Sequence, residues 1–167
     1  MAGIMISTNG SNKQPTSTRE HKGKSLLEFP DSYVAIDIET TGLDPIYDEI
    51  IEIAALKIQN GSETDRFHSL VNPKCEIDEF IESLTGITNA MLEAAPDLEI
   101  VLPQFLEFVG DNVVVGHNVN FDVNFIYDCA ENLKLKLFTN NFVDTMRISR
   151  KLYADLKHHT LADLIVT

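Results

Sequence analysis

The feature that most constrains the fold is a strict alternation of apolar and polar residues from Tyr33 to Glu39. The aliphatic members of this run are Val34, Ile36 and Ile38. Because successive side chains of a strand point to opposite faces of a sheet, the alternation predicts a strand with one buried face. The opposite face then carries two acids, Asp37 and Glu39, side by side near the strand end.

Two further strand-like runs follow at residues 50–58 and 66–71, and a Gln59-Asn60-Gly61-Ser62 segment connects them. Asn-Gly is typical of tight hairpin turns, so we expect the first three strands to be antiparallel neighbours. Farther along the chain, periodicity predicts helices over 98–109, 121–133 and 144–153, with short strands at 112–115 and 142–143. Strands followed by alternating helices and strands predict an α/β domain with a mixed sheet.

Composition limits the class of protein. A chain of 167 residues is long enough for one domain with its own core. Residues 1–24 are mostly polar after Ile6, so we predict a disordered tail there and a folded domain over 25–167. The two cysteines form no metal-binding or disulfide pattern. With no signal peptide or membrane-spanning run, we expect a cytoplasmic protein.

The net charge is −13, and after the first 30 residues nine basic residues stand against 24 acidic ones. Broad electrostatic capture of nucleic acid needs Lys and Arg against phosphates, so this composition argues against it. Any contact with nucleic acid must therefore be local, through a metal ion or a small basic patch. Most of the acids are expected to form a solvated surface.

Three acids stand out as candidate ligands. Asp37 and Glu39 share one face of a strand, and Asp122 lies at the junction of a strand and a helix. A solvated strand surface explains the first two acids, and the helix dipole favours an acid in a first turn. If the three converge, their oxygen atoms are suited to Mg²⁺ or Mn²⁺.

Two segments around these acids resemble motifs of a known family. Asp37-Ile38-Glu39-Thr40-Thr41-Gly42-Leu43 is similar to the first motif of the DEDDh 3′–5′ exonucleases, and Gly116-His117-Asn118-Val119-Asn120-Phe121-Asp122 is similar to the second. Ser83-Leu84-Thr85-Gly86-Ile87-Thr88 and Val143-Asp144-Thr145 match connecting segments of that family. The resemblance runs from about Tyr33 onward and is closest to the proofreading epsilon subunit of DNA polymerase III and to PolC exonuclease domains.

The resemblance implies a ribonuclease H-like fold, a five-stranded mixed sheet flanked by helices. It implies two divalent ions, Mg²⁺ or Mn²⁺, that stabilise charge at the scissile phosphate. Asp37 would contact both ions, Glu39 one of them, and Asp122 the other. The residues it implies around the terminal nucleotide are Thr40, Leu43, His117, Asn118 and Phe121. His117 and Phe121 also suit the protein core, which is the reading we prefer for Phe121.

The third motif of the family is a His followed five residues later by an Asp, the general base and the last metal ligand. His158 and Asp163 have this spacing. Thr160 and Asp163, however, form a capping box before an apolar helix, so we assign Asp163 to capping. We therefore expect the third motif to lie beyond Thr167, in a missing C-terminal part. Without the base, hydrolysis is expected to be slower by about 10²–10⁴-fold.

The predicted activity is release of 5′-mononucleotides from single-stranded 3′ ends of DNA, in proofreading or repair. Two alternatives stay open: an RNA-directed exonuclease of the same fold, and an inactive nuclease-fold module that binds a replication partner. A DNA polymerase or a helicase is the expected protein partner, and no membrane contact is expected.

Overall fold

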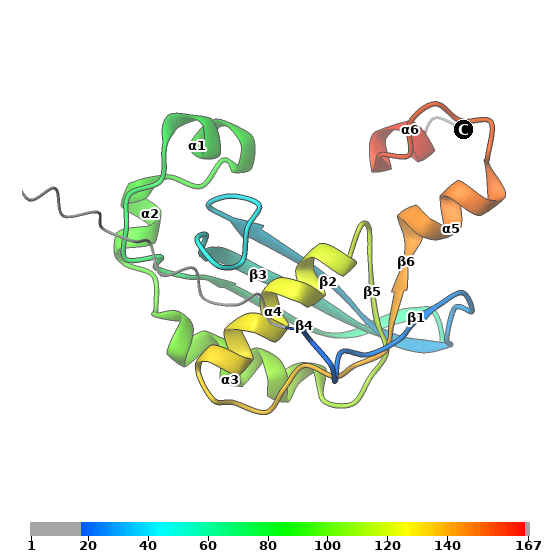
Figure 1. The fold of residues 1–167 in the computed structure, drawn as a ribbon, viewed down its shortest axis with the longest axis horizontal. Coiled ribbons are helices and arrows are strands. Elements are labelled where there is room, and N and C mark those ends of the chain that lie inside the picture. Colours follow the sequence, from blue (N-terminus) through cyan, green and yellow to red (C-terminus); the bar gives the residue numbers. More distant parts are fainter. Residues whose placement is uncertain (1–17, 166–167) are drawn as a thin grey trace, which may run out of the picture.

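A computed structural model of the chain describes residues 18–165 (Figure 1). Its strands are β1 (Ser25–Leu26), β2 (Ser32–Thr40), β3 (Ile50–Gln59), β4 (Ser62–Leu70), β5 (Val114–Gly116) and β6 (Phe142–Asp144). Its helices are α1 (Glu79–Thr85), α2 (Asn89–Glu93), α3 (Leu98–Val109), α4 (Asn120–Asn132), α5 (Thr145–Leu152) and α6 (Leu161–Ile165). The predicted strands and helices are found at these places, within a few residues at their ends.

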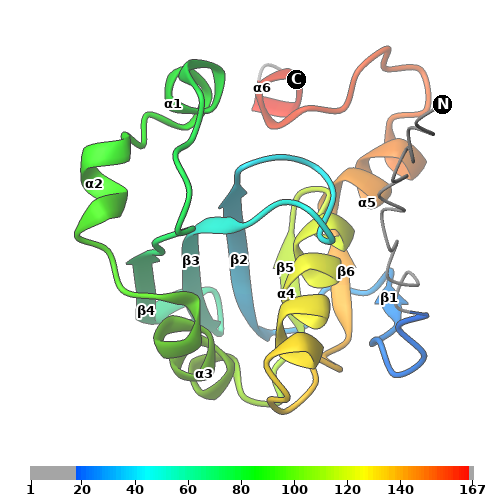
Figure 2. The same ribbon diagram turned by 60° about the vertical axis from the view of Figure 1, so that its left-hand side comes forward.

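The strands form one mixed sheet in the order β1-β6-β5-β2-β3-β4, which Figure 2 shows from β4 on the left to β1 on the right. β2, β3 and β4 are antiparallel neighbours, as predicted, whereas β5 is parallel to β2 and to β6. The α/β class is confirmed, but the sheet has six strands rather than five. The additional strand is the two-residue β1, which runs parallel to β6.

The β3–β4 hairpin has the predicted turn. Gln59 pairs with Ser62, and the two residues between them, Asn60 and Gly61, have φ values of 50° and 75°. Two positive φ values match the right-handed twist of the flanking strands, which is why Asn-Gly is favoured at such turns.

The main core lies between one face of the sheet and helices α3 and α4, which lie in front of the sheet in Figure 2. The predicted inward residues of β2, Val34, Ile36 and Ile38, are all buried. A second, smaller cluster joins the start of β3 to α1 and α2, and consists of Ile51, Ile77, Ile81, Ile87 and Leu92. Gly86 ends α1 with φ of 75°, and Thr88 caps α2.

The structure describes only the C-terminal end of the predicted disordered tail. Residues 1–17 lie outside the described part of the chain. Residues 18–24 are placed against the domain, because Arg19 forms an ion pair with Asp128 and Lys22 bonds to side chains of α4. Polar composition alone suggested disorder, but these polar groups have partners across the fold.

Across residues 18–165, none of the helices has the length and apolar character that crossing a membrane requires.

Candidate active site

Asp37 and Glu39 lie on the face of β2 opposite to the core, as the alternation predicts. Asp37 is exposed and Glu39 is partly buried. The strand register places Ala54 of β3 opposite Asp37 and Glu52 opposite Glu39. Two glutamates directly opposite each other on one sheet face repel, so this region is strongly negative.

Asp122 joins the other two acids from α4. Its side chain is only 5% exposed, and its Oδ1 accepts a hydrogen bond of 3.0 Å from the backbone N–H of Ile38, the residue between Asp37 and Glu39. β5 pairs with β2 only at Val34 and Ala35. Asp122 therefore satisfies a backbone donor of β2 beyond the end of that pairing.

Close packing brings the start of α4 to this place. A Cβ atom on Gly116 would lie 2.7 Å from Cγ2 of Val119 and 2.9 Å from the carbonyl oxygen of Ile36. Any larger residue at position 116 would push the beginning of α4 away from β2. The glycine of the second motif thus sets the distance between Asp122 and the two acids of β2.

The electrostatics of the three acids are coupled. Burial, and then the charges of Asp37 and Glu39, raise the pKa of Asp122 to about 7 despite its hydrogen bonds. Burial and the charge of Glu52 raise the pKa of Asp37, and burial with the charges of Asp37 and Glu52 raises the pKa of Glu39. The sequence alone did not identify Glu52, because its place opposite Glu39 depends on the strand register.

Within the described residues, no group of three or more His, Cys, Asp or Glu side chains is arranged to hold a metal ion as it stands. The donor chemistry nevertheless suits a hard divalent cation, because all three groups supply carboxylate oxygens. A bound cation would also offset the repulsion that raises the pKa of Asp122. The three-acid metal site therefore stays a prediction.

The predicted nucleotide-contacting residues divide into two groups. Leu43 is 84% exposed on the β2–β3 loop, and the side chain of Asn118 is exposed at the turn before α4. Thr40 is buried and donates a hydrogen bond of 2.6 Å to the carbonyl of Gly42, and Phe121 packs against Phe125 with ring centroids 4.9 Å apart. These two residues have structural contacts, as we preferred for Phe121.

His117 links the second motif to the C-terminal part of the described chain. Its Nε2 donates a hydrogen bond of 2.7 Å to the backbone carbonyl of His159, and its Nδ1 lies 3.0 Å from Oγ1 of Thr145. The ring of His159 in turn bonds through Nδ1 to Oγ of Ser149, at 2.7 Å. His117 thus positions the segment before α6.

Asp144 has a role that sequence reasoning missed. Its buried carboxylate accepts hydrogen bonds from the backbone N–H groups of Met146 and Arg147, which caps α5. It also accepts a bond of 3.0 Å from the N–H of Asn118, where φ is 61°. The Val143-Asp144-Thr145 segment therefore holds the turn that leads to Asp122. The sequence signal was an Asp at the first position of a predicted helix.

The segment from His158 to Asp163 forms the predicted capping box. Oδ2 of Asp163 accepts a hydrogen bond of 3.1 Å from the backbone N–H of Thr160, and Oγ1 of Thr160 accepts one of 3.3 Å from the N–H of Asp163. Hydrogen bonds from Thr160 lower the pKa of the exposed Asp163. This reciprocal pair begins α6, so the structural role assigned to Asp163 is confirmed.

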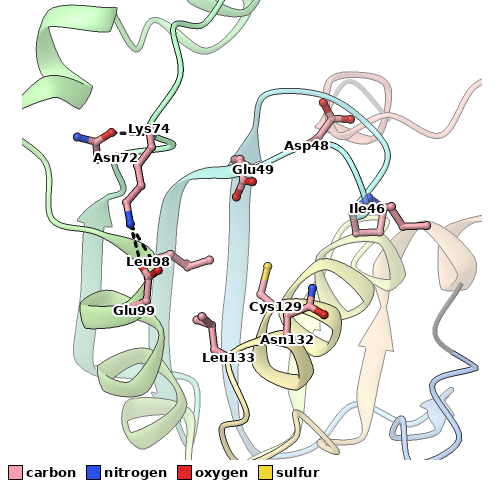
Figure 3. A pocket seen from close by; sticks show the side chains of 11 residues that line it. Ile46, Asp48, Glu49, Asn72, Lys74, Leu98, Glu99, Cys129, Asn132 and Leu133 are labelled. Atoms are coloured by element: carbon pink, nitrogen blue, oxygen red, sulfur yellow. Dashed lines mark hydrogen bonds and ion pairs between the residues drawn. The ribbon is translucent and has the colours of Figure 1, made fainter. Parts of the chain in front are cut away.

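A separate pocket lies between the β2–β3 loop, the start of α3 and the end of α4 (Figure 3). None of the predicted site residues lines it. Its thiol, Cys129, has a pKa raised to about 12 by burial and by nearby acids, so it is not an ionised nucleophile. Its lysine, Lys74, is paired with Asp97 and Glu99. The pocket therefore offers no evident chemistry.

The mixed sheet, with two acids on β2 and a third at the start of α4, defines a class of α/β exonuclease. The chain belongs to the Exonuclease (RNase T) family, whose model matches residues 34–165. It is 44% identical over 133 residues to the DNA polymerase III subunit epsilon of Aquifex aeolicus, covering 80% of this chain and 66% of that protein.

It is also 49% identical over 142 residues to a PolC-type DNA polymerase III of Caldanaerobacter subterraneus, covering 85% of this chain and 10% of that protein. A solved structure of exonuclease X in complex with 5′-overhanging duplex DNA shares the fold, with a TM-score of 0.61 and 27% identity. That match covers 77% of this chain and 68% of the solved chain. The chain thus spans less than two thirds of these two polymerase III relatives and is homologous to their exonuclease regions.

Proposed function

We propose that this chain is a 3′–5′ exonuclease domain that releases 5′-mononucleotides from single-stranded 3′ ends of DNA. The observation that carries the proposal is the position of Asp122, which is buried and bonded to the N–H of Ile38 between Asp37 and Glu39. Burial, and then the charges of those two acids, raise the pKa of Asp122, so its ionisation is coupled to that of Asp37 and Glu39. Such a group of acids is costly unless a proton or a cation neutralises it.

Metal dependence is a property of the exonuclease family. For this chain we propose two Mg²⁺ or Mn²⁺ ions, held by Asp37, Glu39 and Asp122. When bound, the ions would activate water and stabilise charge at the scissile phosphate and the leaving 3′ oxygen. They would also let a chain with a net charge of −13 accept a polyanion, because the charge of the ions reverses the local potential.

We propose that Leu43 and Asn118 contact the terminal nucleotide, because both are exposed next to the acids in sequence. His117 and Thr40 would act through the backbone segments that they hold. A DNA polymerase is the proposed protein partner, since the relatives are named as components of DNA polymerase III. The same relationship is the basis for proposing a cytoplasmic location.

A 5′-labelled single-stranded oligonucleotide tests the activity. Stepwise shortening with Mg²⁺ or Mn²⁺, and none with EDTA, is the expected result. Internal cuts would identify an endonuclease, and faster shortening of the RNA oligomer of the same sequence would identify an RNA-directed enzyme. If Mn²⁺ binds and neither this chain nor one extended past Thr167 forms a metal-dependent product, the domain is better described as a nuclease-fold binding module.

A further inference from the structure

We propose that residues 18–26, which precede the region matched by the exonuclease family, form a strap that positions Asp122 by fixing α4 against the sheet. The strap is anchored at both of its ends. It pairs with β6 through backbone hydrogen bonds, and it contacts α4 through the side chains of Arg19 and Lys22. The proposal rests on the metal site proposed above, and its test separates the two.

The C-terminal end of the strap belongs to the sheet. Ser25 and Leu26 form β1 beside β6, and the N–H of Phe142 donates a hydrogen bond of 3.0 Å to the carbonyl of Lys24. Arg147 of α5 donates a bond of 2.6 Å to Oγ of Ser25. A Cβ atom on Gly23 would collide with the backbone of Asn140. The strap thus lies so close to the chain before β6 that position 23 admits only glycine without a shift.

The N-terminal end of the strap holds α4 at two places. Arg19 bonds through Nε and Nη2 to both carboxylate oxygens of Asp128, whose side chain is only 8% exposed. Such a bidentate pair is geometrically specific, and a buried carboxylate without its partner is costly. The second contact lies nearer the N-terminus of α4 than Asp128. There, Nζ of Lys22 donates hydrogen bonds of 2.9 Å to Oδ1 of Asn120 and to Oδ1 of Asn124.

These contacts surround Asp122 in the sequence of α4. Asn120 and Asn124 lie two residues before and two residues after it, on the side of the helix turned away from it. The residue at the N-cap, Val119, makes no side-chain capping bond. The first turn of α4 is therefore held by Lys22 on one side, and on the other by the hydrogen bond that the N–H of Ile38 donates to Asp122. Releasing the first contact should loosen the second.

The test uses two single substitutions in the full chain, Lys22→Met and Gly23→Ala, with Lys24→Gln as the matched control. Lys24 contacts Asn141 and Phe142 through its backbone atoms, so Lys24→Gln removes one positive charge from the same segment and keeps these contacts. Mn²⁺ affinity is measured by electron paramagnetic resonance, and exchange of the Ile38 amide is measured by NMR. The internal reference is the Val34 amide, which lies in β2 like Ile38 and donates a hydrogen bond to the carbonyl of Val113.

The sign of the effect separates positioning from charge. If Lys22 acted only as a charge, its loss would strengthen binding of a cation to the acids. Positioning predicts the opposite. Lys22→Met and Gly23→Ala should weaken Mn²⁺ binding by about 10-fold, which is the usual loss when a residue that holds a metal ligand in place is changed. Lys24→Gln should weaken Mn²⁺ binding by less than about twofold. Ile38 exchange should accelerate in both variants, while Val34 exchange stays the same.

The positioning role of the strap would be overturned if Lys22→Met and Gly23→Ala left the exchange of the Ile38 amide unchanged and bound Mn²⁺ as tightly as Lys24→Gln. Equal acceleration at Ile38 and Val34 would also overturn it, because it would mean general loss of stability. If the wild-type chain binds no Mn²⁺, the proposed metal site fails, and the exchange of Ile38 relative to Val34 still decides whether the strap positions Asp122.

Discussion

Asp122 and Asp163 both lie in the first turn of a helix, yet their environments differ in every other respect. Asp122 is 5% exposed, lies beside two more acids and has a pKa raised to about 7. Asp163 is exposed and has a pKa lowered by hydrogen bonds from Thr160. Desolvation and like charges penalise the first carboxylate, whereas donors stabilise the second. A helix-start acid is therefore a candidate ligand when the fold leaves its charge unbalanced, and a cap when local donors balance it.

The largest difference is expected in metal-dependent cleavage. Asp37→Ala and Asp122→Asn should lower the rate by at least about 1,000-fold, because each removes an anionic oxygen ligand of the proposed ions. Those ions would stabilise the charge of the transition state by several kcal/mol. Asp163→Asn is the matched control and should keep wild-type cleavage. Calorimetric titration with Mn²⁺ accompanies the rates, and heats in Asp37→Ala equal to those of the wild type would contradict the three-acid site.

The pH dependence of stability is the next largest effect. Because the folded pKa of Asp122 is raised from 3.8 to about 7, folding takes up a proton between these values, and stability is lost as the pH rises through this window. Between pH 5 and 8 in EDTA, the free energy of unfolding of the wild type should fall by about 3 kcal/mol relative to Asp122→Asn. Urea unfolding at the two pH values measures it.

Relative to Asp163→Asn, the free energy of unfolding of the wild type should show no such decline between pH 5 and 8. If the difference in free energy of unfolding between wild type and Asp122→Asn is equal at pH 5 and 8, neither burial nor the neighbouring acids raise the pKa of Asp122. The basis for treating the three acids as one unit would then be lost.

The pattern of residues predicted the regular elements well, because their signals are local. Alternation over 33–39 fixed both the strand and the shared face of Asp37 and Glu39, and Asn60-Gly61 fixed the hairpin. β1 was not predicted, since two residues carry no periodicity and its pairing depends on backbone bonds to β6 across more than 100 residues.

The candidate site was predictable only as a set of residues. The hydrogen bond from the N–H of Ile38 to Asp122 depends on where β5 ends beside β2. The position of Glu52 opposite Glu39 depends on the register of β2 and β3. Neither relation has a local signal. The ion pair of Arg19 with Asp128 joins residues 109 apart, so the composition around Arg19 gave no signal for it.

Asp144 sharpens the comparison, because it is buried like Asp122 and caps a helix like Asp163. Asp144→Ala should destabilise the chain by about 2 kcal/mol, since it leaves the N–H groups of Met146 and Asn118 without their acceptor. Asn at the same position can still accept these bonds and should recover most of the loss. Thermal unfolding of both variants measures this, and equal losses would mean that the charge itself matters there.

The smallest effect is expected at Asp163. Asp163→Ala removes the acceptor for the backbone N–H of Thr160, so the melting temperature should fall by about 2–4 °C, the scale of one lost cap in a domain of this size. Thr160→Ala removes the other half of the box and should cause a similar fall, and the double variant should fall by less than the sum, because the two residues share one motif. Mn²⁺ affinity should stay the same in all three variants. If Asp163→Ala instead abolished metal-dependent cleavage with an unchanged melting temperature, Asp163 would act at the metal site, and the division between the two helix-start acids would be wrong.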